Sequence, residues 1–460
     1  MASFLISNIS YGFVGDAAGS RISGALRVRD GLIAEIGDLE PAPGERVIDA
    51  SACVVTPGLV NTHHHLFQSV LKAVPDGLNH GLDTWLQKVP YAFWPYIDEE
   101  TLRIAATAGM AELVLTGTTT VADHHYAFSD RYDYDPSAVL FEVAEEFGVR
   151  FVLARGGGTK GSDYFDDPAM PPPMAEPLDR YLAGVEAAAN RWHDSGPLAM
   201  TRVAAAPTTP TFNVEAHELR DIAAAARAKG LRLHSHLSEN TTYVAYTIET
   251  YGKRPVHWLA EQGWTGPDVW YAHLVEIDDS EVAHLAETGT AMAHCAQANA
   301  RLGFGIAPAD LLHHSGGIVS LGVDGAGANE AANMGAALYE TFNIHRATKG
   351  AAATTPETVL HWACQGGARC LGYEQTGLLK PGMAADISLF ELSHPRHMGL
   401  HDPAVAPIVT GAAPVRASFV GGRQIVENGR ITWLDLETLG DNARRVTERL
   451  IQKRQQTLAS

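Results

Sequence analysis

The chain has 460 residues, of which 46% are hydrophobic and 19% are charged, and its formal net charge is −19. This composition allows a large buried core and excludes global disorder. The acidic balance disfavours nucleic acid and anionic membranes as partners, and no stretch approaches the ~18–20 apolar residues that span a bilayer. The first residues, MASFLISNISYGFV, lack a basic region followed by a long apolar run, so we expect no signal peptide and a cytoplasmic protein.

Short strands are predicted at both ends of the chain. Residues 2–55 alternate apolar and polar positions in short runs that Gly and Asp interrupt, which is typical of antiparallel strands. The same pattern returns in GMAADISLFEL and APVRASFVGGRQIVENGRI, and residues 441–458 then have a helical pattern. We expect the two ends, 1–56 and 376–460, to form one small β-sandwich domain that includes this helix.

The middle of the chain alternates helical stretches with apolar strand-like runs. The predicted helices, each followed by such a run, are 101–117, 137–148, 218–230, 279–289 and 308–317. This repetition predicts an α/β fold, a TIM-like (β/α)8 barrel over residues 57–375 that carries the chemistry. The Pro- and Asp-rich segment 159–178 interrupts the repetition, and we interpret it as a long loop over one barrel face, a candidate lid.

Imidazole and carboxylate side chains stand where several predicted barrel strands end. His63 and His65 follow CVVTPGLVNT, and alternate residues of an extended chain share a face, so both rings point together and His64 points away. Three further predicted strands end in the same way: LRLHSHLSE at His234 and His236, VWYAH at His273, and IVSLGVDG at Asp324. One such His is more often a core residue, but the recurrence on four strands favours a catalytic metal site with an open position.

Several segments resemble the amidohydrolase superfamily over nearly the whole chain: PGLVNTHHHLFQ, HSHLSE, YAH, SLGVDGAGAN and LLKPGMAADISLFEL. The resemblance is to the branch that deaminates aromatic heterocycles, with VAAAPTTPTFN and GLHDPAVAPIVTGAAP similar to the isoxanthopterin (pterin) deaminases and, after these, the 8-oxoguanine deaminases. It implies the metal ligands His63, His65, His236 and Asp324, and the catalytic residues Glu239, His273 and Asp324.

These residues suit the removal of an exocyclic amino group by water. A bound divalent metal supplies hydroxide near neutral pH, and Asp324 accepts a proton from the attacking water. Glu239 would carry protons to the ring nitrogen and the departing amine, the alternative being a solvated loop carboxylate. His273 would orient the attacking water or polarise the attacked carbon, or else only support the ligands.

One divalent ion per subunit is expected, Zn²⁺ with Fe²⁺ as the alternative. Binuclear relatives bridge two metals with a lysine on the fourth barrel strand. The predicted fourth strand, MTRVAAAPTT, has none, and no lysine occurs between Lys160 and Lys229.

Five residues near predicted strand ends are candidates for substrate binding: Gln68, Trp85, His125, Tyr126 and Arg155. Gln68 can donate to and accept from a ring lactam, and Trp85 can stack on a planar ring. The alternatives are a surface role for Gln68, packing for Trp85, support of the ligands for His125 and Tyr126, and a structural ion pair for Arg155.

The favoured function is deamination of a pterin or oxopurine, with an isoxanthopterin-like substrate first and 8-oxoguanine second. Guanine or cytosine deamination and triazine hydrolysis follow, and a non-catalytic scaffold is the alternative from another class. The predicted partner is a small heterocyclic molecule, and the family resemblance implies a homo-oligomer.

Overall fold

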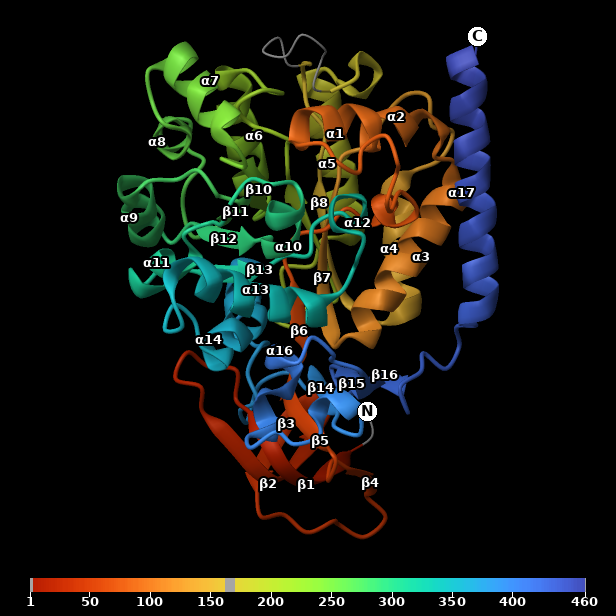
Figure 1. Cartoon of the computed structure of the whole chain (residues 1–460), viewed down its shortest axis with the longest axis vertical. Coiled ribbons are helices and arrows are strands. Elements are labelled where there is room, and N and C mark those ends of the chain that lie inside the picture. Colours follow the sequence, from red (N-terminus) through yellow and green to blue (C-terminus); the bar gives the residue numbers. More distant parts are fainter. Residues whose placement is uncertain (1–2, 162–169, 460) are drawn as a thin grey trace.

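The computed structural model describes residues 3–161 and 170–459. Within these residues, eight parallel strands close into a barrel (Figure 1). In barrel order the strands are β6 (Leu59–Asn61), β7 (Thr118–His125), β8 (Arg150–Arg155), β9 (Thr201–Ala205), β10 (Arg232–Leu237), β11 (Val269–His273), β12 (Ala291–His294) and β13 (Val319–Leu321). The predicted (β/α)8 barrel is therefore confirmed.

Helices surround the barrel, and local chemistry sets their ends. At the start of α4, Asp135 accepts a hydrogen bond from the Ser137 amide, and Gly148, with φ of 70°, ends the helix just before β8. The helices are α1 (Leu82–Lys88), α2 (Pro90–Phe93), α3 (Glu99–Leu115), α4 (Pro136–Phe147), α5 (Leu178–Trp192), α6 (Ala216–Ala228), α7 (Thr241–Tyr251), α8 (Pro255–Glu261), α9 (Asp279–Thr288), α10 (Ala296–Arg301), α11 (Ala309–His314), α12 (Ala326–Asn329), α13 (Met334–Lys349), α14 (Pro356–His361), α15 (Gly367–Cys370), α16 (Ala406–Val409) and α17 (Leu436–Ala459).

A second sheet is built from both ends of the chain. Its order is β16 (Arg423–Glu427), β15 (Val415–Val420), β14 (Ile387–Glu391), β5 (Cys53–Pro57), β1 (Phe4–Phe13), β2 (Arg21–Arg29) and β3 (Leu32–Gly37), with β4 (Arg46–Asp49) paired to β1. Phe4 on β1 stacks on Phe419 on β15 at 5.0 Å, although two strands separate them. The sheet therefore curls around its own apolar core, as a sandwich does. The predicted boundaries at 56/57 and 375/376 stay predictions.

The small sheet joins the amino-terminal end of the barrel. Pro57 ends β5 and Leu59 begins β6, so the chain passes directly from one sheet to the other. Arg150, the first residue of β8, forms a buried ion pair with Asp386 just before β14, with Nε–Oδ2 2.7 Å and Nη2–Oδ1 3.1 Å. Because both links lie where barrel strands begin, the carboxyl ends of the strands remain available for chemistry.

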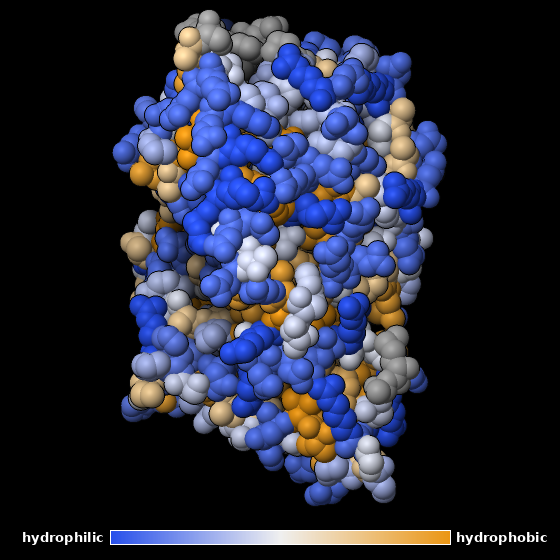
Figure 2. Space-filling view, turned by 90° about the vertical axis from the view of Figure 1, so that its right-hand side faces the viewer, coloured by the Kyte–Doolittle hydropathy of each residue, from blue (hydrophilic) through white to orange (hydrophobic). Residues whose placement is uncertain are grey.

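Helix α17 lies along the side of the barrel beside α3 (Figure 1). Its Arg449 pairs with Asp98 at 2.7 Å, and its Val446 and Leu450 are buried. The helix begins at Leu436, before the predicted residue 441, and it packs against α3 and α2 of the barrel. Its predicted inclusion in the small β domain stays a prediction. The face that carries α17 is mainly hydrophilic (Figure 2).

Among the described helices, none has the length and apolar character needed to cross a membrane.

The predicted loop 159–178 falls partly outside the described residues, which omit 162–169. Next to that gap, Gly158 forms a bridge with Ala175, and Glu176 turns inward to meet Arg155. The predicted role of this loop as a lid stays a prediction.

Candidate active site

A cluster of imidazoles and a carboxylate lies at the carboxyl ends of the barrel strands. His63 and His65 follow β6, His236 is on β10, His273 ends β11, and Asp324 follows β13. All five side chains are buried. Parallel strands in a closed barrel end at one face, so residues distant in the sequence meet there. His64 points away, as the alternation predicts, and its Nδ1 donates to the Asp324 carbonyl oxygen at 2.6 Å.

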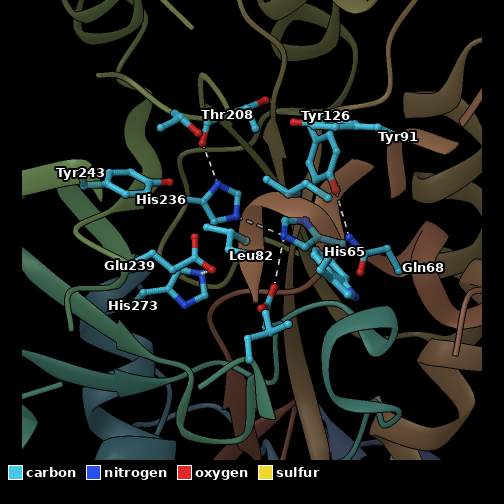
Figure 3. A pocket seen from close by; sticks show the side chains of 15 residues that line it. His65, Gln68, Leu82, Tyr91, Tyr126, Thr208, His236, Glu239, Tyr243 and His273 are labelled. Atoms are coloured by element: carbon cyan, nitrogen blue, oxygen red, sulfur yellow. Dashed lines mark hydrogen bonds and ion pairs between the residues drawn. The ribbon is translucent and has the colours of Figure 1, made fainter. Parts of the chain in front are cut away.

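The candidate ligand atoms lie close together, and Figure 3 shows His65 and His236 side by side at the pocket. His65 Nε2 lies 3.1 Å from His236 Nε2. Asp324 Oδ1 lies 3.4 Å from His63 Nε2 and 3.2 Å from His65 Nε2. Ligand atoms of His63, His236, His273 and Asp324 all lie within 4.8 Å of one another. The spacing is suitable for a single metal ion bound by nitrogen and oxygen atoms.

Backbone carbonyls determine which ring nitrogen of two histidines faces the cluster. His65 Nδ1 donates to the carbonyl oxygen of His124, and His236 Nδ1 donates to that of Thr208, both at 2.6 Å. A carbonyl oxygen can only accept, so each Nδ1 carries a proton and each Nε2 of the neutral ring presents a lone pair.

His63 is oriented through a second histidine. His234 Nδ1 lies 3.0 Å from the Trp270 carbonyl oxygen and must donate to it, so His234 Nε2 accepts from His63 Nδ1 at 2.8 Å. His63 Nε2 then carries a lone pair, and this buried nitrogen has no hydrogen-bond partner among the described residues. Three such lone pairs and a carboxylate repel one another unless a cation lies between them. The residues therefore fit a divalent metal.

Asp324 is held in an uncommon backbone conformation. Its φ is 62° and that of His273 is 72°, both in the left-handed region that residues other than glycine rarely adopt, and such strain concentrates at functional sites. Asp324 therefore presents its carboxyl group to the cluster from a strained backbone position.

Glu239 and His273 lie together at the edge of the cluster (Figure 3). Glu239 Oε1 is 3.5 Å from His273 Nε2, and His273 Nδ1 donates to Asn299 Oδ1 at 2.8 Å. Burial, and then the negative charge of Asp324, raise the pKa of Glu239 well above its ordinary value. A buried carboxyl that keeps its proton is suited to general acid chemistry.

An aromatic pocket opens onto this cluster (Figure 3). Gln68 Nε2 donates to Tyr126 Oη at 3.0 Å, and Gln68 Oε1 is buried without a partner among the described residues. The Trp85 indole donates to the Gly327 carbonyl oxygen at 3.1 Å, which fixes the ring as a wall. Besides the cluster residues, the lining is Gln68, Leu82, Trp85, Leu86, Tyr91, Tyr126, Thr208, Thr209, Tyr243 and Leu302.

Sequence reasoning named Gln68, Trp85 and Tyr126, all of which line the pocket, and missed Tyr91 and Tyr243. Tyr243 lies in the first turn of α7, the helix that begins just after Glu239, and this closeness in sequence was a signal for it. Asn299, which was not among the site residues predicted from the sequence, orients His273.

The structure does not bring His125 and Arg155 into this lining. His125 packs edge-on against Phe67 and Phe128, in an apolar environment. The Arg155 guanidinium forms a buried ion pair with Glu176, with Nη2–Oε1 2.9 Å. Both strands end where predicted, but these two side chains point away from the pocket. We therefore leave them out of the substrate site.

A (β/α)8 barrel that gathers three imidazoles and a carboxylate at its carboxyl face is typical of metal-dependent hydrolases. The chain belongs to the amidohydrolase family, whose model matches residues 54–425. It is thus a hydrolase that acts on carbon–nitrogen bonds, and this family depends on metal.

Similar proteins cover nearly the whole chain. An isoxanthopterin deaminase from an unknown prokaryotic organism is 45% identical, with 94% of this chain and 93% of the relative covered. An 8-oxoguanine deaminase from Pseudomonas aeruginosa is 37% identical, with 92% and 94% covered. The solved structure of the atrazine chlorohydrolase TrzN from Arthrobacter aurescens TC1, complexed with zinc, has a TM-score of 0.90 at 28% identity, with 96% and 100% covered.

Proposed function

We propose that this protein is a hydrolytic deaminase that removes an exocyclic amino group from an oxidised pterin or an oxopurine, with isoxanthopterin as the favoured substrate. The observation that carries the proposal is the buried pair of Glu239 and His273, 3.5 Å apart, between the ligand cluster and an aromatic pocket. Amidine hydrolysis needs a nucleophilic water, a proton source for a poor leaving group and a binding surface for a planar ring.

We propose that His63, His65, His236 and Asp324 hold one zinc ion, which would supply hydroxide near neutral pH. Zinc is favoured because a similar solved structure contains it, and Fe²⁺ is the alternative for the same donors. One ion is favoured because β9, the fourth barrel strand, carries no lysine in TRVAA. Asp324 would accept a proton from the attacking water, because its carboxyl group lies beside His63 and His65 in the cluster.

Glu239 would complete the proton transfers. It gives its proton to the ring nitrogen beside the attacked carbon, as the water oxygen forms its bond to that carbon. Asp324 would then pass the proton it took from the water to the amino group, the carbon–nitrogen bond would break, and ammonia would leave. Glu239 would regain a proton from the hydroxyl oxygen on the attacked carbon as the carbonyl forms. Its raised pKa supports this role, because the carboxyl keeps a proton to give. His273, oriented by Asn299, would position the attacking water. A halide leaves without protonation, so a buried acid favours deamination over dehalogenation.

The pocket would recognise the ring by stacking and by one amide. Trp85, Tyr91 and Tyr243 supply aromatic surface for a planar bicyclic ring. Gln68 Oε1 has no partner among the described residues and can accept from a lactam N–H of a pterin or oxopurine. We rank isoxanthopterin first because the chain is similar to an isoxanthopterin deaminase, and 8-oxoguanine second because it is less similar to an 8-oxoguanine deaminase. We also propose a homo-oligomer, which light scattering would test.

An ammonia-release screen tests the function directly. Zinc-loaded protein is assayed with isoxanthopterin, 8-oxoguanine, guanine, cytosine and an aminotriazine, with Glu239→Gln as the matched inactive control. We expect the highest kcat/KM with isoxanthopterin. Release of ammonia from none of the five would overturn the proposal, and a preference for the triazine would reassign the substrate.

A further inference from the structure

A small cavity of about 200 Å³ lies at the opposite end of the barrel from the ligand cluster. Arg202, the second residue of β9, and Arg232, the first residue of β10, both line it. His193, just after α5, and Gly372, just after α15, line it as well. Since these strands begin here and end at the active site, the cavity is separate from the catalytic pocket.

The two guanidinium groups in this cavity have no acidic partner. Among the described residues, neither arginine has a carboxylate oxygen within ion-pair distance, although the chain carries a net charge of −19. Arg202 donates to the carbonyl oxygens of Leu371 at 3.0 Å and Gly196 at 2.8 Å, and Arg232 donates to that of Pro267 at 2.5 Å. Carbonyl oxygens orient the groups but do not neutralise them. The Arg202 guanidinium also lies 3.8 Å from the centroid of the Tyr373 ring, and Asp194 and Asp268 act on the two arginines from beyond ion-pair distance.

Three nitrogens of the cluster are buried with unused hydrogen-bonding capacity. Arg202 Nε and Arg232 Nε have no acceptor among the described residues, and neither does His193 Nε2. His193 Nδ1 accepts from the Val203 amide at 3.1 Å, so in the neutral ring the proton is on Nε2. Buried donors are nearly always satisfied in folded proteins, and an unsatisfied group indicates an ion or water that binds there.

Gly372 keeps the space between the arginines open. A Cβ at this position would lie 2.8 Å from Arg232 Nη1 and 3.2 Å from Arg202 Nη1, so both guanidinium groups approach the same point. The φ of Gly372 is 77°, which other residues rarely adopt. Burial lowers the pKa of both arginines, which reflects the cost of holding these charges away from water. An anion between them would remove that cost.

We propose that this cavity binds a small oxyanion of the phosphate class. Guanidinium groups match such oxyanions in geometry as well as in charge, and the His193 N–H adds a third donor. The space of about 200 Å³ is sufficient for a single inorganic anion. The site would stabilise the fold by an amount that rises with the logarithm of the anion concentration above Kd, because the anion binds only where the two strands begin side by side.

Inorganic phosphate is the probe for this proposal. Binding to the full, zinc-loaded chain is measured by titration calorimetry and by the rise in Tm, with sodium chloride at matched ionic strength as the reference. Two variants act by independent routes: Arg232→Gln removes a donor group, and Gly372→Ala fills the space between the arginines. Arg227→Gln is the control, because Arg227 is a partly exposed arginine already paired with Asp268.

We expect saturable phosphate binding in the wild type, competition by sulfate and none by chloride. Affinity should fall at least tenfold in each variant that retains its circular dichroism spectrum, and should be unchanged in Arg227→Gln. Either variant alone decides the question if the other does not fold. The proposal is overturned if the wild type shows no saturable binding, or if a folded variant binds phosphate as tightly as the wild type, which would place the anion elsewhere, for example at the metal.

Discussion

Replacing His234 with Phe isolates the effect of orienting one metal ligand. The His63 Nδ1 proton loses its acceptor at 2.8 Å in a fully buried position. Leaving a buried donor unsatisfied costs about 1–3 kcal/mol. Loss of a partner that orients a ligand histidine typically weakens metal binding by about 10–100-fold, or ~1.4–2.8 kcal/mol. The two estimates agree, so we expect His234→Phe to bind the metal about 10–100-fold more weakly than the wild type.

Phe is chosen because it preserves packing. The His234 ring stacks on Trp270 with centroids 4.4 Å apart and planes 16° apart, which a phenyl ring can reproduce. The metal dissociation constant is measured by competition with a chelator for wild type, His234→Phe and His234→Gln, whose amide oxygen restores an acceptor. His361→Phe is the control, a buried histidine elsewhere in the fold. If His234→Phe binds metal within twofold of wild type, the argument from the orientation of His63 is wrong.

Three further predictions follow from the site. Glu239→Gln should lower kcat by at least about 10²-fold, because the amide cannot transfer the proton, while metal content by elemental analysis stays normal; substantial residual turnover would exclude the proton-transfer role. His236→Asn should lose both metal and activity, and a normal metal content would show that His236 is not a ligand. Arg155→Met breaks the buried pair with Glu176 and should lower the free energy of unfolding by ~3–5 kcal/mol in urea denaturation. If folded Arg155→Met instead raises KM with unchanged stability, Arg155 binds substrate after all.

The barrel, and the gathering of the proposed ligands at one of its faces, could be predicted from the sequence because their signals are local. A helix that ends at a glycine, as α4 does at Gly148, followed by a buried strand, is encoded within about twenty residues. The placement of His63 and His65 on one face depends only on the alternation of an extended chain. Asp324 could be expected at the same face because parallel strands in a closed barrel end together.

Contacts between residues far apart in the chain were decided by the tertiary structure alone. His234 and His236 share a strand and a face, and only packing against His63 and Thr208 shows that the first orients a ligand and the second faces the cluster. The same limit applies to the pairing of β5 with β14. It also applies to the ion pair between Arg449 on α17 and Asp98, which lies some 350 residues earlier in the chain. His125 and Arg155 occupy predicted strand-end positions, yet neighbouring aromatic rings and Glu176 turn them from the pocket. The position of a residue on a strand determines where its side chain leaves the backbone. The elements packed around the strand determine which groups that side chain contacts.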